Sequence, residues 1–357
     1  MSLFLRHGAF CFVRYNNDTI ILRKIVYSKS FVYVCILKNS QNITRNMKAK
    51  FIPLAIIVIL FAGGIIALLT PQETQQATQQ ATQQVSSGRL DYYPDFPSQY
   101  IVARDVNVWL PDGYRRGNKC QVLYMHDGTM LFDSTTTWNK QEWCVDEVMG
   151  KLIADKQIKN CIVVAIDNTD NRLNEYFPSK TLQYTPEDID NYGMMQPLGD
   201  EYLKFIVEEL KPFIDKCYRP LTDRENTFVM GSSMGGLISM YALCEYPQVF
   251  GGAICMSTHL SFGHLPLYGD NHAWAEAFEQ YISDHIDTAN DCVIYMDRGT
   301  VGIDEPYAPY QIEVDSMFKA KGWDDEHFVT LVFEGHEHNE NYWSQRIDQP
   351  LTFVLNK

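Results

Sequence analysis

The stretch from Thr227 to Glu245 constrains the fold of this 357-residue chain more than any other. A short apolar run, TFVMG, leads into the glycine-flanked serine motif GSSMGG at 231–236, and the apolar segment LISMYALCEY follows at once. The first run has the length of a buried strand, and the last has the length of a buried helix. A strand and a helix that are apolar on all sides indicate a sheet whose two faces are both covered.

The same alternation of short apolar runs and longer amphipathic segments continues through residues 90–357. The runs that read as strands are 100–109, 122–126, 161–166, 227–231, 252–257, 292–296 and 328–333. The segments that read as helices are 142–154, 200–217, 234–245, 273–286, 309–321 and 339–355. This order predicts an α/β fold with a mostly parallel central sheet and helices on both faces. In such sheets active sites gather at the carboxyl ends of the strands.

Ser233 is the central residue of a G-x-S-x-G motif set between a strand and a helix. A turn this tight leaves little room for flanking side chains, and it exposes the serine hydroxyl at the start of the helix. This layout is the nucleophile elbow of the α/β-hydrolase fold, so we predict Ser233 as the nucleophile. Ser232 is the competing serine, but its place in the motif is expected to turn it away. A purely structural glycine-rich turn is the alternative.

A serine nucleophile needs a histidine base and a carboxylate that orients it, and this fold places them after the serine in the order acid, then histidine. His336 and His338 both follow the late apolar run FVTLVFEG, and position alone does not choose between them. The acid candidates Asp297, Asp304 and Glu305 follow the preceding strand. Asp297 directly ends that strand, which suits a structural role, so position favours Asp304.

The oxyanion hole of this fold uses backbone N–H groups from the loop after an early strand and from the residue after the nucleophile. We therefore predict Gly128 or Thr129 together with Met234. His126 and Asp127 begin the same loop, and because they precede the serine we expect them to hold it in place.

Aromatic side chains in candidate loops near the carboxyl ends of the strands suit either a stacking wall for a sugar or phenolic ring, or core packing. They are Trp138, Trp143, Tyr176, Tyr192 and Trp274. Asn171 and Arg172 suit either the orientation of a polar substrate group or a structural salt bridge.

Residues 51–69 are nineteen uncharged residues, long enough to cross a bilayer as a helix. Lys48 and Lys50 precede them and the next basic residue is Arg89, so the positive-inside rule predicts an extracytoplasmic body, periplasmic or secreted. We expect 47–70 to be a signal peptide or signal anchor that begins at Met47. Residues 1–46 show no clear periodicity and read as an upstream extension outside the fold.

Residues 71–89 repeat a Gln-Gln-Ala-Thr unit and predict a flexible linker before a catalytic domain at 90–357. Nine of the 30 Lys and Arg residues but only one of the 44 Asp and Glu residues lie in 1–70. The remaining 21 basic and 43 acidic residues give the rest of the chain a net charge of −22. Such a body repels phosphates, so we expect no nucleic-acid partner, and membrane contact only through 51–69.

Cysteine is spread thinly through the chain. Seven of the nine cysteines lie beyond the apolar segment, and none of these forms a C-x-x-C pair. We expect most of them to be small buried hydrophobic residues.

Residues 90–357 resemble the esterase D-like branch of the α/β-hydrolases, which includes enterochelin, feruloyl and acetylxylan esterases and the mycolyltransferases. The stretches that carry the resemblance are VLYMHDGTMLFD, TTTWNKQEWCVDEVM, AIDNTDNRLNEYFP, FVMGSSMGGLISMYAL, IYMDRGTVGIDEPYAPYQ and GHEHNENYW. In that group the base precedes a tryptophan as H-x-x-x-x-W, which matches His338 and Trp343 and leaves out His336. The acid follows a Gly-Thr turn, which matches Asp304, although this loop is longer than the plain form.

The resemblance implies hydrolysis of a small-molecule or glycan-linked carboxylic ester through an acyl-enzyme, without a metal or organic cofactor. An acyltransferase with the same triad is one alternative, and a non-catalytic surface binding module on the same fold is another. The presence of all three triad residues favours an enzyme.

Overall fold

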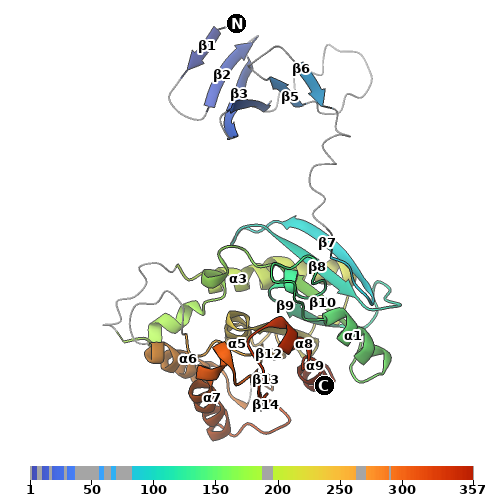
Figure 1. The fold of residues 1–357 in the computed structure, drawn as a ribbon, viewed down its shortest axis with the longest axis vertical. Helices are drawn as coiled ribbons and strands as arrows, with labels where there is room; N and C mark the ends of the chain where they lie inside the picture. Colours follow the sequence, from blue (N-terminus) through green and yellow to red (C-terminus); the bar gives the residue numbers. More distant parts are fainter. Residues whose placement is uncertain are drawn as a thin grey trace. The chain divides into compact units, whose positions relative to one another are not determined.

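The computed structural model describes residues 83–186, 196–262, 271–288 and 291–356, and six strands within residues 2–69. The chain divides into two compact units, Met1–Ala81 and Thr82–Lys357. The second unit contains all of the candidate site residues, and Figure 1 shows its helices arranged around a twisted sheet.

The first unit contains an antiparallel sheet in which the six strands follow one another in sequence order. The strands are β1 (Ser2–Leu5), β2 (Phe10–Tyr15), β3 (Asp18–Tyr27), β4 (Ser30–Ile36), β5 (Ile56–Ile59) and β6 (Ile66–Leu69). Regular structure before residue 47 differs from our expectation for residues 1–46. The strands are rich in β-branched and aromatic residues, which favour pairing even where the apolar alternation is weak.

The apolar segment 51–69 is described only in part. Its described residues form β5 and β6, whereas we expected one helix, and the rest of the segment lies outside the described residues. An uninterrupted apolar run suits a buried strand as well as a helix, so periodicity could not separate the two. Within the described parts of the chain, no helix is long and apolar enough to cross a membrane. The extracytoplasmic location and the start at Met47 stay predictions.

The end of the expected linker 71–89 is bound to the catalytic unit. Gln83 donates from Nε2 to the carbonyl oxygen of Thr129 (2.9 Å), and the N–H of Gln84 donates to Asp133 (2.9 Å). Ser86 donates to Asp146 from both its N–H (2.6 Å) and its hydroxyl (2.9 Å). The linker prediction was therefore wrong for its last residues, whose serine and glutamine groups bind polar partners. Residues 71–82 lie outside the described residues.

The catalytic unit is built on an eight-stranded sheet in the order β14-β13-β12-β11-β9-β10-β8-β7. Strands β9 to β14 run parallel to their neighbours within this group, whereas β8 pairs antiparallel with both β10 and β7. The strands are β7 (Arg89–Phe96), β8 (Arg104–Leu110), β9 (Gln121–Met125), β10 (Cys161–Ile166), β11 (Thr227–Ser232), β12 (Gly252–Met256), β13 (Val293–Arg298) and β14 (Phe328–Val332). The predicted α/β-hydrolase architecture, a mostly parallel sheet, is confirmed.

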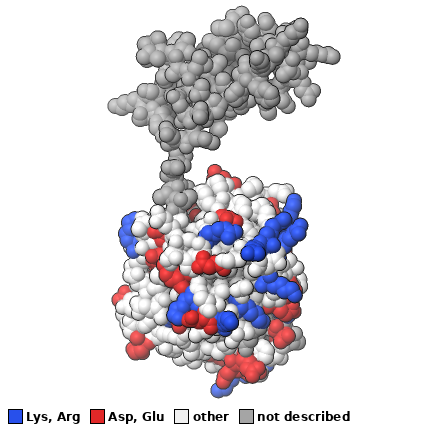
Figure 2. Space-filling model, turned by 90° about the vertical axis from the view of Figure 1, so that its right-hand side faces the viewer, with Lys and Arg blue, Asp and Glu red and all other residues white. Residues whose placement is uncertain are grey.

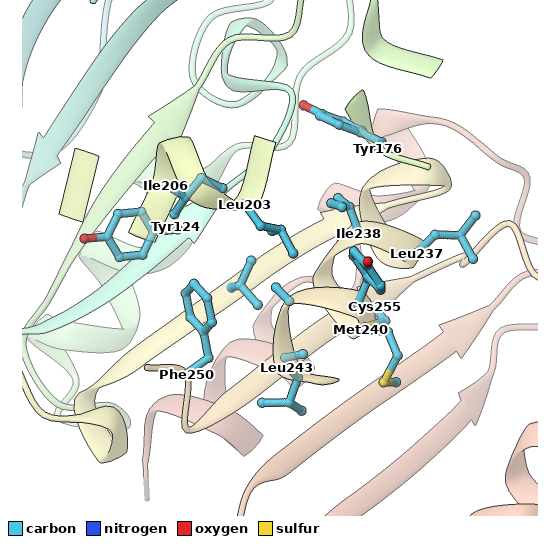
Figure 3. Packing of buried hydrophobic residues seen from close by; sticks show 14 of the residues in the cluster. Tyr124, Tyr176, Leu203, Ile206, Leu237, Ile238, Met240, Leu243, Phe250 and Cys255 are labelled. Atoms are coloured by element: carbon cyan, nitrogen blue, oxygen red, sulfur yellow. The ribbon is translucent and has the colours of Figure 1, made fainter. Parts of the chain in front are cut away.

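Helices cover both faces of this sheet, and each face has its own apolar cluster. On one side lie α3 (Gly199–Lys204), the π-helical turn Phe205–Leu210, α4 (Lys211–Tyr218), α5 (Met234–Glu245), α6 (Asn271–His285) and α7 (Ala308–Ala320). On the other lie α1 (Val145–Ala154) and α9 (Asp348–Leu355). Strand β9 shows the alternation, since Tyr124 belongs to the first cluster and Leu123 to the second. Figure 3 shows Leu243 of α5 together with Tyr124 and Phe250 among the side chains of the first cluster.

Most of the predicted elements agree with the observed ones within a few residues. The segment predicted as one helix over 339–355 is two, α8 (Glu340–Ser344) and α9. The edge strand β7 was missed, because its sequence RLDYYPDF contains a proline and is largely exposed on one side. Proline and irregular pairing, here a shift between Tyr93 and Phe96, are typical of edge strands.

The charged side chains on one face and the burial of the cysteines can be compared with what the sequence predicts. On the face shown in Figure 2, basic and acidic side chains are interspersed among uncharged ones, with no continuous basic stripe. The seven cysteines of this unit are free thiols, and five of them are buried.

Asp146 accepts hydrogen bonds from residues 83–88, which we call the strap, and its pKa gives a pH-dependent prediction. Burial and the neighbouring Glu147 raise the pKa of Asp146 to about 6, although the bonds from Ser86 oppose that shift. A folded-state pKa above the ordinary carboxyl value means that ionisation disfavours the folded state. We therefore expect the unfolding free energy of the native protein to fall, relative to Asp146→Asn, as the pH rises from about 4 to about 6.

Urea unfolding at several pH values measures this difference, which should be flat above pH 7. The matched control is Asp155→Asn, because Asp155 is exposed and pairs with Lys151 on the same helix surface. A constant difference between native protein and Asp146→Asn across this pH range would contradict the raised pKa that burial and Glu147 give Asp146.

Candidate active site

Ser233 occupies a strained turn between β11 and α5. Its φ of 58° and ψ of −123° lie in a region that side-chain-bearing residues rarely adopt, and its N–H donates to the carbonyl oxygen of Met256 (3.0 Å). A Cβ on Gly231 would lie 2.8 Å from the backbone carbonyl group of Gly235, so only glycine fits there. The turn leaves Ser233 partly exposed, whereas Ser232 is buried at the end of β11.

His338 is bonded to Asp304 through Nδ1 and Oδ1, which are 2.5 Å apart. The second oxygen of Asp304 accepts from the N–H of Gly299 (2.7 Å) and from the hydroxyl of Ser257 (2.6 Å). Burial alone would raise the pKa of Asp304, but the bonds from His338, Ser257 and Gly299 outweigh it and lower the pKa. The carboxyl group is therefore ionised and fully paired at neutral pH, as the orienting acid of a histidine requires.

Asp297 has a different partner from Asp304. It is completely buried and pairs with Arg346, whose Nη2 and Nε lie 3.0 and 3.2 Å from its two oxygens. It also accepts from the N–H of Ser257 (3.0 Å), so it supports the loop that follows β12. This arrangement agrees with the structural role expected for Asp297, and Glu305 is exposed.

His336 also has a partner other than Asp304. Its Nδ1 lies 3.2 Å from Nη1 of Arg346, and its carbonyl oxygen accepts from the N–H groups of Thr300 and Val301. Burial and the charge of Arg346 lower the pKa of its ring. His336 therefore packs behind the loop that carries Asp304, and only His338 faces the acid.

A single pocket of about 560 Å³ brings the serine and the histidine together. Its lining residues are Asp127, Thr129, Met130, Trp138, Asn139, Gln141, Trp143, Asn168, Arg172, Ser232, Ser233, Ile303, His338, Asn339, Glu340 and Trp343. Among the hydrogen bonds of the described residues, none joins Ser233 to His338. In free hydrolases the bond between nucleophile and base is commonly long and tightens with substrate.

Of the predicted oxyanion residues, Thr129 lines this pocket, whereas Gly128 and Met234 are chain neighbours of lining residues. Gly128 and Thr129 form a short 3₁₀ turn after β9, and Thr129 lines the pocket. Gly128 packs against β10 so closely that a Cβ there would lie 2.5 Å from Oδ1 of Asp167. Met234 is the first residue of α5, so its N–H has no helical carbonyl partner one turn before it.

His126 and Asp127 fix this loop to neighbouring side chains, as expected. His126 is buried and bonded through Nδ1 to the hydroxyl of Tyr202 (2.8 Å), and burial lowers its pKa to about 3. Asp127 binds Arg172 through two bonds of 2.6 and 2.8 Å. Arg172 therefore lines the pocket as part of an ion pair, and its guanidinium also lies over the ring of Tyr176.

The residues predicted to bind substrate separate into two groups. Trp138, Trp143 and Arg172 line the pocket; Trp138 is 85% exposed, whereas Trp143 is buried beside Trp343 with ring centroids 5.1 Å apart. Two of the predicted residues are not in the pocket lining. Trp274 is completely buried against Phe177 and Phe262, and Asn171 bonds to Asn174 in the turn before α2 (Arg172–Glu175).

Tyr176, the other described aromatic candidate, is buried beneath the pocket, and Tyr192 lies outside the described residues. Sequence reasoning missed the pocket residues Asn168 and Ile303, and the buried Ser257, Tyr307 and Arg346. Asn168 follows the end of β10, so the rule that sites gather at strand ends would have found it. The contacts of Ser257 and Arg346 join distant segments, and no local pattern marks them.

A strained serine at a strand end and an acid-bonded histidine on a mostly parallel sheet form the arrangement typical of the α/β-hydrolase fold. Residues 102–351 match the family model described as "Putative esterase". The chain therefore belongs to this family.

Two curated relatives and one solved structure illustrate the likeness. The uncharacterized protein YbbA of Bacillus subtilis (strain 168) is 26% identical over 149 residues, which are 42% of this chain and 54% of YbbA. The siderophore enterobactin esterase of Emericella nidulans is 24% identical over 240 residues, which are 64% of this chain and 72% of the relative. This chain thus spans about half the length of YbbA. A ferulic acid esterase structure superposes with a TM-score of 0.55 at 21% identity, over 76% of this chain and 99% of that one, which shows the fold.

The buried ion pair behind the site yields a stability prediction. Arg346→Met leaves Asp297 without its buried counter-charge, and we expect the unfolding free energy to fall by about 3–5 kcal/mol. Urea denaturation measures the change, and Arg115→Met is the matched control because Arg115 is exposed. A loss below about 1 kcal/mol would show that the pair is not a buried one.

Proposed function

We propose that this protein is a serine carboxylic-ester hydrolase in which Ser233, His338 and Asp304 form a catalytic triad. The observation that carries the proposal is the bond between His338 and a buried, ionised Asp304 in the pocket that also contains Ser233. Serine is a weak nucleophile near neutral pH and requires such a base.

The reaction proceeds in two acyl-transfer steps. Ser233 attacks the ester carbonyl carbon while His338 accepts its proton and passes it to the departing alcohol. The N–H groups of Met234 and of Thr129 or Gly128 stabilise the negative oxygen of the tetrahedral intermediate. A water molecule then attacks the acyl-enzyme, gives its proton to His338 and releases the acid product.

The pocket supports an aromatic or carbohydrate-linked ester as the substrate. Trp138 presents an exposed indole at the rim, and the amide groups of Asn139, Gln141 and Asn168 face the same space. Flat rings stack on indole, and amides bind hydroxyl groups. Relatives are named for enterobactin and ferulic acid esters, both of which contain phenolic rings.

The adjacent serines provide a matched test of the nucleophile. Ser233→Ala should lower kcat for p-nitrophenyl acetate on the order of 10⁴-fold or more and abolish labelling by a fluorophosphonate, which reacts only with an activated serine. Ser232→Ala should retain both within about tenfold, since Ser232 is not at the centre of the turn. Near-native turnover in Ser233→Ala would refute the triad. Labelling also separates an enzyme from a non-catalytic binding module.

The exposed indole gives a prediction on specificity. Trp138→Ala should raise KM for a feruloyl ester about 2- to 12-fold, the range expected for loss of one aromatic stacking contact, with little change in kcat. Trp138→Phe should recover part of this loss. Hydrolysis of p-nitrophenyl acetate should be nearly unchanged, because its acyl group is too small to reach the rim. An equal loss on both esters would argue against stacking at Trp138.

A further inference from the structure

The side chain of Gln83, at the start of the strap, reaches the loop that is proposed to supply oxyanion donors. Its Nε2 lies 2.9 Å from the carbonyl oxygen of Thr129 and 3.4 Å from that of Gly128. Only the NH₂ end of a carboxamide can donate to a carbonyl oxygen, so these contacts fix which way the Gln83 amide points. The mechanism above gives this side chain no role.

The carbonyl groups and the N–H groups of the loop point in opposite directions, as they do in any helical turn. The turn is closed by the N–H of Met130, which donates to the carbonyl oxygen of Asp127 (2.9 Å). The N–H groups of Gly128 and Thr129 come before this first bonded donor, so the turn itself gives them no partner. Gln83 therefore binds the carbonyl end of the turn, and the two candidate oxyanion donors lie at its other end.

Two routes of connected peptide groups join Gln83 to these donors. In the first, its amide contacts the carbonyl of Gly128, and the same peptide group carries the N–H of Thr129. In the second, its amide bonds the carbonyl of Thr129, whose peptide group carries the N–H of Met130. That N–H bonds the carbonyl of Asp127, whose peptide group carries the N–H of Gly128. Hydrogen bonds in such a chain polarise one another, so the bond from Gln83 strengthens the N–H groups at the far end.

The rest of the strap holds Gln83 in place. Ser86 binds the buried carboxyl group of Asp146 at the start of α1. The carbonyl oxygen of Ser87 accepts from the indole N–H of Trp109 in β8 (2.8 Å). Gln83 is thus three residues from an anchor on α1 and four residues from an anchor on β8. An amide that is held in this way acts on developing charge without a costly rearrangement.

The backbone of the loop requires such support. Asp127 begins the turn with a φ of 56° and a ψ of 44°, a left-handed conformation that residues with a side chain seldom adopt. Strained conformations persist only where the surrounding structure holds them. Arg172 binds the carboxylate of Asp127, and Gln83 binds the carbonyl groups that follow it.

We propose that Gln83 is a positioning residue for the oxyanion hole, whose amide aligns and polarises the N–H groups of Gly128 and Thr129. The inference rests on the proposed function, because it adds a partner to the loop of the same site. Negative charge develops on the substrate carbonyl oxygen during both acylation and deacylation. Gln83 therefore stabilises both transition states more than it stabilises the bound ester.

Two neighbouring glutamines provide a matched test. Gln83→Met keeps the length of the side chain and removes its N–H donors. We expect kcat/KM for p-nitrophenyl acetate to fall about tenfold, less than the loss of an oxyanion donor itself, which costs on the order of 10²- to 10³-fold. Gln84→Met is the control and should leave kcat/KM nearly unchanged, because Gln84 is exposed and binds Asp133 through its backbone N–H.

A second variant tests the donor directly. Gln83→Glu keeps the size of the side chain but places a carboxylate, which only accepts hydrogen bonds, against two carbonyl oxygens. It should lower kcat/KM more than Gln83→Met does. Thermal unfolding of each variant checks that the fold is retained.

Inhibition by benzyl trifluoromethyl ketone separates this role from a purely structural one. Oγ of Ser233 bonds to the ketone carbon, the carbonyl electron pair moves to the oxygen, and His338 takes the serine proton. The adduct therefore places a negative oxygen in the oxyanion hole. The inhibition constant should rise in Gln83→Met by the same factor as kcat/KM falls. The alcohol made by reducing this ketone forms no such oxygen, so its inhibition constant should stay unchanged.

An unchanged kcat/KM in Gln83→Met would overturn the proposal, as would a fall that the ketone does not follow or that the alcohol shares. If Ser233→Ala is inactive in the same assay, such a result removes only the role of Gln83 and leaves the triad intact. If Ser233→Ala remains active, the proposed function itself fails.

Discussion

The hydroxyl of Ser257 is the junction on which the geometry of the site depends. It accepts hydrogen bonds from the indole N–H of Trp343 (3.0 Å) and from Nη2 of Arg346 (2.8 Å), so its own hydrogen is directed to Asp304. The loop after β12 supplies this hydroxyl, the loop after β13 supplies the acid, and α8 and the turn that follows it supply the two donors. A buried polar network with every member paired is rigid, which keeps the carboxyl group aligned with His338.

The strap formed by residues 83–88 extends this restraint to the opposite wall of the pocket. Gln83 bonds the carbonyl oxygen of Thr129, and Ser86 and Ser87 bond the buried carboxyl of Asp146 at the start of α1. The carbonyl of Ser87 also accepts from the indole of Trp109 in β8 (2.8 Å). The loop proposed to supply oxyanion donors is therefore supported on one side by Arg172 and Asp127 and on the other by chain that precedes the first strand of the sheet.

Local sequence patterns were sufficient to predict the site residues that belong to contiguous motifs. The motif around Ser233 and the position of His338 before Trp343 were readable because the turn and the following helix are contiguous in sequence. Asp304 was preferred over Asp297 on loop position, and the contrast in their buried partners is consistent with that preference. Trp274 was misassigned because an aromatic residue in an amphipathic segment suits a core as well as a rim, and only packing decides. Tyr307 and Ser257 carry no motif, since their contacts are tertiary.

The buried thiols bear on the conditions under which the molecule can exist. Burial raises the pKa of Cys120 to about 11 and that of Cys292 to about 12, so neither forms thiolate readily at neutral pH. Oxidants and alkylating agents react with thiolate rather than thiol. The five buried thiols of the catalytic unit are therefore shielded from such reagents in the folded protein, in a reducing cell interior or in an oxidising fluid alike, whereas Cys144 and Cys217 are partly exposed.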